Sequence, residues 1–316
     1  MRILLVKTSS LGDVIHNLPV ASDLRRTFPE AVIDWCVEER LVDIPRLHPA
    51  VTQVLPVAIR RWRRHWGRPS TWREISAFRS RLRTQFYDIV LDTQGLLKSA
   101  AIARLARGRH CGYAAEAARE PLAARFYDAT FVIPRHVHAV TRNRWLGAAA
   151  FDYPVDLPLD YGIQPPLIED GPLAKDRVAL LTATSRQDKL WPEGDWCALA
   201  RALVQRGLTP VLPFGSAVER QRAERIAAAA QGALLPPALS LAQMASLIAG
   251  CRLAIGVDTG LSHLAAALKV PVIALYVSTE PELTGVFGSG FVRNLGRSGA
   301  PPLLAEVLAV AEHALR

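Results

Sequence analysis

The sequence has few cysteines and lacks the common signatures of nucleotide and metal binding. Its 316 residues include four cysteines with no CxxC pair and no Cys/His spacing, so disulfides and a structural zinc are disfavoured. Neither GxGxxG nor GxxxxGK[ST] occurs, which removes the dinucleotide fingerprint and the P-loop. A DxD carboxylate pair is also missing, since Asp156 and Asp160 do not form one. We therefore assign no metal ligands and expect metal-independent chemistry.

Long apolar runs and low-complexity tracts are missing as well. The longest apolar stretch, residues 264–277, is too short for a membrane span and is interrupted by Lys269 and Pro271. Half of the residues are hydrophobic, so disorder is not expected. Met1 runs directly into an apolar segment without a cationic leader, and we expect a cytoplasmic protein.

The apolar segments that are present alternate with helical patterns in both halves of the chain. Their continuous apolar character predicts parallel strands covered on both faces, near residues 3–6, 32–37, 54–59, 89–92, 131–133, 178–182, 210–213, 234–235, 253–257 and 272–276. Helices are expected at 12–28, interrupted by Pro19, and at 195–206, 219–230, 241–249 and 303–315. The length and the proline-rich stretch 153–166 predict two Rossmann-like α/β domains, 1–160 and 161–316, facing each other across a cleft.

Two strand ends carry polar residues that suggest a ligand. After the apolar run 253–256, the segment VDTGLSH (257–263) predicts a helix N-terminus whose free N–H groups and dipole favour a phosphate. Asp258 as an ordinary helix cap explains this segment equally well. At the other strand end, after residues 3–6, Asp13 fits either a helix cap or a catalytic base.

Basic residues dominate, with a net charge of +9, and they gather in one segment with tryptophans. From Arg60 to Arg83, arginines interleave with Trp62, Trp66 and Trp72. Such a segment suits phosphates, carboxylates or an anionic membrane surface. A solvated cationic helix is the structural alternative, and nucleic acid is the weaker partner because no recognised binding module is present.

Seven blocks in this chain, in the same order, resemble the lipopolysaccharide heptosyltransferases of glycosyltransferase family 9. The blocks are VKTSSLGDV (6–14), PVAIRRWR (56–63), QGLLKSA (94–100), AREPLA (118–123), DKLWPE (188–193), LPFG (212–215) and VDTGLSH (257–263). The resemblance covers nearly the whole chain. It implies a GT-B architecture, in which the final helix can cross back to the first domain.

The resemblance also implies a reaction. It is the transfer, with inversion, of L-glycero-D-manno-heptose from ADP-heptose to a 3-deoxy-D-manno-octulosonic acid (Kdo) hydroxyl of Kdo-lipid A. ADP-heptose is a substrate, and no cofactor is implied. The expected enzyme is a monomer, peripheral on the cytoplasmic face of the inner membrane. Transfer of a second heptose, another nucleotide-sugar enzyme such as a hexosamine epimerase, and a non-enzymatic binder of anionic lipid or nucleic acid remain alternatives; the block at 58–62 favours the first heptose.

Roles for individual residues follow from these blocks, from the strand ends and from the basic residues outside the blocks. Asp13 is the expected base, and Lys189 is expected to stabilise the departing diphosphate. The expected donor-binding residues are Thr184, Ser185, Lys189, Glu219, Asp258, Thr259, Gly260 and His263. The expected acceptor-binding residues are Ser10, Gly12, Arg60, Arg61, Arg63, Lys98, Arg119 and Arg142. The block at 182–188 departs from the family pattern at Thr182, Ser185 and Gln187, which leaves selectivity for the adenine nucleotide open.

Overall fold

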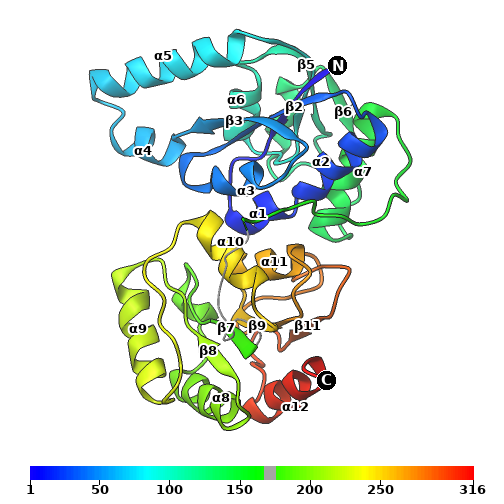
Figure 1. Ribbon diagram of the computed structural model, residues 1–316. Helices are drawn as coiled ribbons and strands as arrows, with labels where there is room; N and C mark the ends of the chain where they lie inside the picture. Colours follow the sequence, from blue (N-terminus) through cyan, green and yellow to red (C-terminus); the bar gives the residue numbers. More distant parts are fainter. Residues whose placement is uncertain (167–175) are drawn as a thin grey trace. The chain divides into compact units, whose positions relative to one another are not determined.

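The structure, a computed structural model, describes residues 1–166 and 176–316 and divides into two compact units. The first unit is Met1–Ile163 and the second is Gln164–Arg316. We describe each unit by itself. Each is built on one fully parallel sheet with helices on both faces, as Figure 1 shows. The predicted pair of parallel α/β domains is therefore confirmed, while their facing across a cleft stays a prediction.

The sheet of the first unit has six strands in the order β3-β2-β1-β4-β5-β6. The central strand β1 is apolar and almost entirely buried, which is why it lies in the middle. The chain moves outward from β1 to β3 and then returns to pair β4 with β1, so these two strands form the switch point of the topology. The strand bounds are β1 Arg2–Val6, β2 Val32–Glu38, β3 Val51–Val57, β4 Phe86–Asp92, β5 Arg107–Tyr113 and β6 Ala129–Phe131.

Helices cover both faces of this sheet. Pro19 lies in the first turn of α2, where its missing N–H costs nothing, so the expected helix at 12–28 is split into α1 and α2. One face is buried by α5 and α6 through Phe78, Leu82 and Ile102, and α7 packs against α2. The helix bounds are α1 Leu11–Ile15, α2 Leu18–Thr27, α3 Asp43–Arg46, α4 Ile59–Arg64, α5 Pro69–Arg83, α6 Leu97–Ala103 and α7 Ala139–Phe151.

The sheet of the second unit has five strands in the order β11-β10-β9-β7-β8. Here β7 pairs with both β8 and β9, so the switch point lies between β7 and β9. Strand β9 is buried along its whole length. The strand bounds are β7 Arg177–Leu181, β8 Thr209–Val211, β9 Leu253–Val257, β10 Val272–Leu275 and β11 Val292–Leu295.

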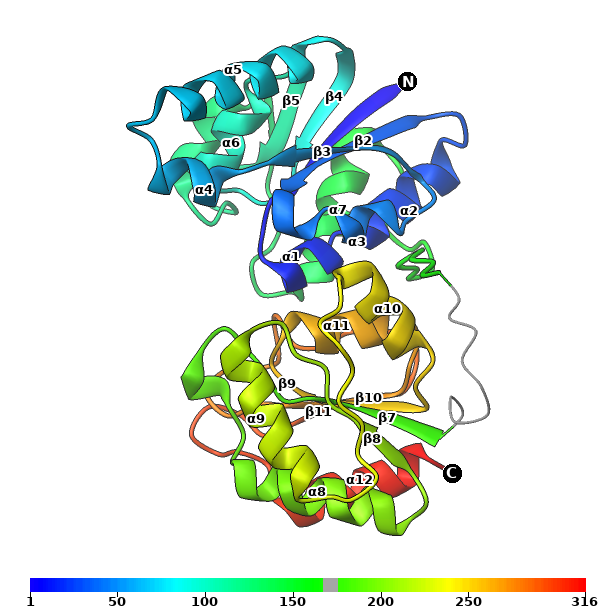
Figure 2. The same ribbon diagram turned by 60° about the vertical axis from the view of Figure 1, so that its left-hand side comes forward.

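In the second unit, α8, α9 and α12 lie on one face of the sheet and α10 and α11 on the other, as Figure 2 shows. Trp191 and Trp196 pack edge to face, 5.2 Å between centroids, in the core on the first of these faces. The final helix, for which the resemblance implied a return to the first domain, buries Val307 and Ala311 in this same core. The helix bounds are α8 Glu193–Gln205, α9 Ala217–Ala228, α10 Leu241–Ala249, α11 Gly260–Ala267 and α12 Leu304–Ala314.

The strand predictions differ from the structure at three places. Strands β5 and β11 were not predicted, because the first begins with polar residues and glycine and the second is an edge strand with exposed side chains. The strand expected at 234–235 was wrong: Leu234 forms only an isolated bridge with Val211. Of the helices in residues 1–166 and 176–316, none has the length and apolar character needed to cross a membrane.

Candidate active site

In the first unit, the loops that follow β1 and β4 are tied together at the switch point. The Thr8 backbone N–H and hydroxyl each donate to Gln94 Oε1 at 2.7 Å. Gln94 Nε2 in turn donates to the Ser9 carbonyl at 2.9 Å. Because ligands of open parallel sheets bind beyond the carboxyl ends of the strands, these loops form the expected ligand-binding edge of the unit.

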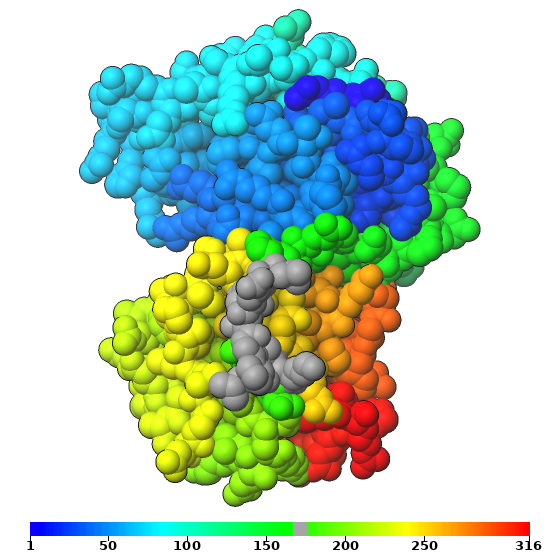
Figure 3. All heavy atoms as spheres, viewed as in Figure 1, coloured from blue at the N-terminus to red at the C-terminus, as the bar shows by residue number. Residues whose placement is uncertain are grey.

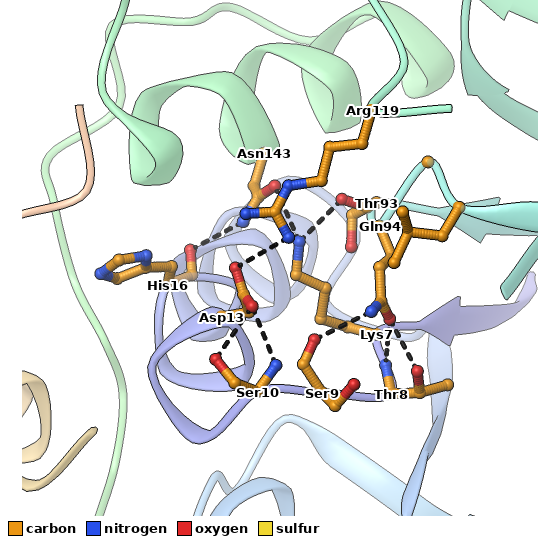
Figure 4. A network of polar contacts seen from close by, with 12 residues as sticks. Lys7, Thr8, Ser9, Ser10, Asp13, His16, Thr93, Gln94, Arg119 and Asn143 are labelled. Atoms are coloured by element: carbon orange, nitrogen blue, oxygen red, sulfur yellow. Dashed lines mark hydrogen bonds and ion pairs between the residues drawn. The ribbon is translucent and has the colours of Figure 1, made fainter. Parts of the chain in front are cut away.

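Asp13 lies in α1, at this edge, with its carboxylate surrounded by hydrogen-bond donors and cations (Figure 4). Its Oδ2 accepts from Ser10 N at 2.8 Å and from Ser10 Oγ at 3.0 Å, and its Oδ1 lies 3.7 Å from Arg119 Nη1. Burial by itself raises the pKa of Asp13, but the charges of Lys7 and Arg119 and the Ser10 bonds lower it below its ordinary value. Asp13 therefore completes the capping box of α1, in which Ser10 is the N-cap residue, and its lowered pKa favours the charged form. A fifth of its side chain (21%) is exposed.

Three of the predicted acceptor-binding cations lie around these loops. Lys98 Nζ donates to Ser9 Oγ at 3.2 Å, and Arg119 faces Asp13. Arg142 reaches from α7 over the Tyr113 ring, 4.9 Å from its centroid, and donates to the Ala117 carbonyl at 2.6 Å. Burial lowers the pKa of Arg142. These three positive charges exceed the single negative charge of Asp13, so this edge suits an acceptor that carries carboxylates or phosphates.

The predicted acceptor residues of the basic segment lie on α4, where acidic groups contact two of them. The Arg60 N–H donates to Glu38 Oε1 at 3.3 Å. The Arg61 guanidinium pairs with Glu39 at 3.0 Å and with Glu74 at 2.7 Å. Arg63 is exposed on the same helix. The structure thus brings Ser10, Gly12, Lys98, Arg119 and Arg142 to the loops around Asp13. It places the start of α4 beside Glu38, whose own N–H donates to the Thr8 carbonyl of those loops at 3.1 Å.

In the second unit, Asp258 lies at the carboxyl end of β9 and joins the strands on both sides. Its Oδ2 accepts two hydrogen bonds: one from Nζ of Lys189, which follows β7, at 2.6 Å, and one from Oγ1 of Thr279, which follows β10, at 2.7 Å. Thr184 Oγ1 donates to the Asp258 carbonyl at 3.2 Å. Three loops therefore meet at one carboxylate on the switch point, with a cation beside it.

The N-terminus of α11 follows Asp258 directly in the chain. Thr259 is its N-cap residue and Gly260 its first residue, and no Thr259 side-chain bond caps the helix. Backbone N–H groups and the helix dipole there favour an anion. His263 lies in the first turn and is buried, with its Nε2 4.0 Å from Asp258 Oδ1. The predicted phosphate-binding segment is thus a strand end leading into a helix, as the sequence indicated.

Glu219 and Ser185 are two predicted donor-binding residues that are not joined to Asp258 by the hydrogen bonds described above. Glu219 Oε2 accepts from the Gly215 N–H at 2.7 Å, and Ser216 caps α9 by accepting from Glu219 N at 3.3 Å. Ser185 is exposed next to Thr184. Glu219 therefore fixes the turn after β8, and the structure does not join it directly to Asp258.

Sequence reasoning missed Lys7 in the first unit and Thr279 in the second. Both follow a buried strand directly or within a few residues, which is the same signal that selected Asp13 and Asp258. In the described residues no group of three His, Cys, Asp or Glu side chains is placed to hold a metal ion.

Each unit has a parallel sheet with polar loops at its switch point, which is where open α/β sheets bind ligands, and comparison with known proteins identifies the family. Residues 75–300 match glycosyltransferase family 9 (heptosyltransferase). The chain belongs to this family and is a glycosyltransferase.

Particular relatives are similar over almost the whole chain. Lipopolysaccharide heptosyltransferase 1 of Pseudomonas aeruginosa is 47% identical over 293 residues, which are 91% of this chain and 82% of that protein. The structure of the E. coli heptosyltransferase WaaC with ADP has a TM-score of 0.91 and 39% identity, covering 99% of this chain and all of the other. WaaC with ADP-2-deoxy-2-fluoro heptose has a TM-score of 0.89 over 99% and 98% of the two chains.

Proposed function

We propose that this chain transfers L-glycero-D-manno-heptose from ADP-heptose to a Kdo hydroxyl of Kdo-lipid A, in the synthesis of the lipopolysaccharide inner core. The observation that carries the proposal is the Asp13 carboxylate, partly exposed beyond a strand end, held by Ser10 and 3.7 Å from Arg119 Nη1. Similarity to the P. aeruginosa and E. coli heptosyltransferases supports the choice of donor and acceptor.

The proposed reaction is a single displacement. Asp13 takes the proton of the acceptor hydroxyl as its oxygen forms a bond to the anomeric carbon of the heptose. The bond from that carbon to the diphosphate oxygen breaks, and ADP leaves with the bonding electrons. Because attack and departure occur on opposite faces of the carbon, the configuration inverts. The step needs no metal in this proposal, since Lys189 and backbone N–H groups stabilise the leaving diphosphate.

Donor binding is assigned to the second unit. Thr259 and Gly260 at the start of α11 would bind phosphate, together with the hydroxyls of Thr184 and Ser185. Lys189, paired with Asp258 in this structure, would contact the diphosphate as negative charge develops on it. Asp258 would contact the heptose hydroxyls and Glu219 the ribose, with His263 beside the phosphates.

Acceptor binding is assigned to the first unit. Ser10, Gly12, Lys98, Arg119 and Arg142 surround Asp13 or the loops beside it, and would orient the Kdo carboxylates by charge-assisted hydrogen bonds. Arg60, Arg61 and Arg63 on α4 would contact more distant phosphates of lipid A. For Arg61 this requires competition with Glu39 and Glu74.

A surface for the lipid is proposed on α4 and α5, which follow each other at the edge of the first unit in Figure 3 (light blue to cyan). Trp66 and Trp72 are 72% and 57% exposed there, among exposed arginines. Such a surface suits peripheral contact with an anionic membrane, with the indole rings at headgroup depth. We accordingly propose a cytoplasmic monomer on the inner face of the inner membrane, with no nucleic-acid partner.

The test is mass spectrometry of Kdo-lipid A after incubation with the purified protein and ADP-heptose, with chelator present. We expect the mass of one heptose to be added. Asp13→Asn, which keeps the shape but removes the base, should lower turnover by about 10²- to 10⁴-fold while ADP still binds. Asp152→Asn, an exposed aspartate after α7, is the control and should transfer normally.

Three results would contradict the proposal in different ways. Full turnover in Asp13→Asn would exclude Asp13 as the base. No added heptose in the wild type, together with transfer to an acceptor that already carries heptose, would replace the first transfer with the second. If the chelator alone stopped transfer, the metal-independent step would be wrong.

A further inference from the structure

Lys7 is a buried cation that the proposed reaction does not use. It follows β1, and only 5% of it is exposed. Burying an ammonium is unfavourable unless partners compensate, and a methionine of similar length would fill the same space without a buried charge. Burial lowers the pKa of Lys7 to about 8, so at neutral pH it is still largely charged. A buried positive charge at this position is therefore expected to have a structural or functional role.

The hydrogen bonds of Lys7 join β1, β4 and α7. Its Nζ donates to the Thr93 carbonyl, after β4, at 2.8 Å, and to Asn143 Oδ1 on α7 at 3.4 Å (Figure 4). The Asn143 amide is oriented by its other end, because Nδ2 donates to the His16 carbonyl at 3.2 Å. His16 directly follows α1, which carries Asp13. Lys7 is thus connected through one amide to the helix that positions the proposed base.

Lys7 also contributes charge to a mixed cluster. Lys7 and Asp13 interact with each other and with further charged or titratable groups, namely Arg119, Arg142, Asp92 and Tyr113. Asp92 is fully buried and already accepts from Gln94 N and Tyr127 OH, each at 2.8 Å. Arg119 is half exposed, so solvent screens its effect on Asp13. Lys7 is the cation of this cluster that is shielded most from solvent.

We propose that Lys7 is a positioning residue of the reaction, whose buried ammonium holds the ends of β1 and β4 around Asp13 and keeps that carboxylate ionised in mildly acidic solution. The inference rests on the proposed role of Asp13 as base. Without Lys7, burial would still raise the pKa of Asp13, and only Arg119 and Ser10 would remain as the main groups that lower it. The carboxyl group would then bind a proton at a higher pH, and protonated Asp13 cannot accept the acceptor proton.

The test compares kcat at about pH 7.5 and about pH 5.5, since removing a neighbouring opposite charge shifts a carboxyl pKa by about 1 to 3 units. The variants are Lys7→Met and Lys7→Gln, which remove the charge, and Lys7→Arg, which keeps it. Lys7→Gln can still donate to the Thr93 carbonyl, so it carries the test if Lys7→Met folds poorly. Lys269→Met, the same change at an exposed lysine of the second unit, is the matched control.

We expect the wild type and Lys269→Met to keep their kcat between the two pH values. Lys7→Met and Lys7→Gln should lose kcat on acidification, as the protonated fraction of Asp13 grows. Lys7→Arg should behave as the wild type in this ratio, even if its kcat is lower. The affinity for ADP, bound by the second unit in our proposal, should be the same in all variants.

An equal loss of kcat at both pH values in the neutral variants would show that Lys7 only supports the fold, and would overturn the inference. Unchanged activity in these variants would overturn it as well. Failure of the proposed function is a separate result, because it would appear as missing heptose transfer in the wild type.

Discussion

Asp258 accepts two hydrogen bonds at the same carboxylate oxygen, one from Lys189 and one from Thr279. If Lys189 contacts the diphosphate during the reaction, Thr279 remains to orient Asp258 toward the sugar. A hydrogen bond to a charged group contributes about 1.5 to 3 kcal/mol. Thr279 should therefore matter for the heptose part of the donor and not for ADP.

We predict that Thr279→Val, which removes the hydroxyl and keeps the shape, weakens binding of ADP-heptose by about tenfold or more, since 1.4 kcal/mol is a factor of ten. Binding of ADP should change little. Isothermal titration calorimetry with both ligands measures the difference, and Thr279→Ser, which keeps a hydroxyl, should restore most of it. Equal weakening of ADP and ADP-heptose would contradict the role given to Asp258.

Site residues that belong to a local sequence pattern could be predicted, whereas those that depend on the order of strands in the sheet could not. Asp13 and Asp258 were predicted because a carboxylate after a buried strand is a local pattern. Thr279 and Lys7 follow strands too, but their importance depends on which strands are neighbours. Only the sheet order places β10 beside β9, and β4 beside β1. Arg61 was expected to bind the acceptor, and nothing in its own segment shows that Glu39 and Glu74 would pair with it.

At the scale of elements, the packing of α11 on β9 determines where Asp258 lies. Gly256, in β9, permits this packing: a Cβ atom there would lie 2.4 Å from Ser262 Oγ and 2.7 Å from Leu181 Cβ. Ser262 Oγ also donates to the Val257 carbonyl at 2.8 Å, which fixes the helix to the strand end. A larger residue at Gly256 must push α11 or β7 away.

We therefore predict that Gly256→Ala lowers the free energy of unfolding by about 1 to 3 kcal/mol, as for other overpacked cores. It should also weaken ADP binding, because the N–H groups of α11 move. Thermal unfolding and ADP titration measure the two effects. Gly250→Ala is the control: its Cβ would meet nothing closer than the Leu247 carbonyl oxygen at 3.6 Å. Similar behaviour of the two variants would exclude the steric explanation.

Element predictions succeeded where burial on both faces makes a strand largely apolar, as in β9 and in β1 after Arg2. They failed where tertiary context supplies what the local pattern lacks. Strand β5 begins Arg107-Gly108-Arg109 and is held by pairing with β4 and β6. At residue 234 the apolar pair predicted a strand, but pairing stops after one bridge to Val211.

At the scale of the whole molecule, the net charge of +9 favours anionic partners, and the exposed tryptophans select among them. Long-range attraction alone would bind any polyanion and would disappear as salt is added. Indole rings that enter the headgroup region add apolar burial that salt does not screen. The combination on α4 and α5 therefore predicts a membrane surface in preference to a soluble polyanion.

We predict that the protein binds vesicles containing anionic phospholipid and does not bind neutral ones, with binding reduced but not abolished at high salt. Trp66→Ser combined with Trp72→Ser should lower the apparent affinity by about tenfold or more, because each exposed indole contributes apolar area on insertion. Leu303→Ser, at a side chain 73% exposed in the second unit, is the matched control and should bind as the wild type. Vesicle co-sedimentation measures all three proteins. If the tryptophan variant binds like the wild type, electrostatics alone accounts for membrane contact; if Leu303→Ser is equally weakened, the contact surface is not confined to α4 and α5.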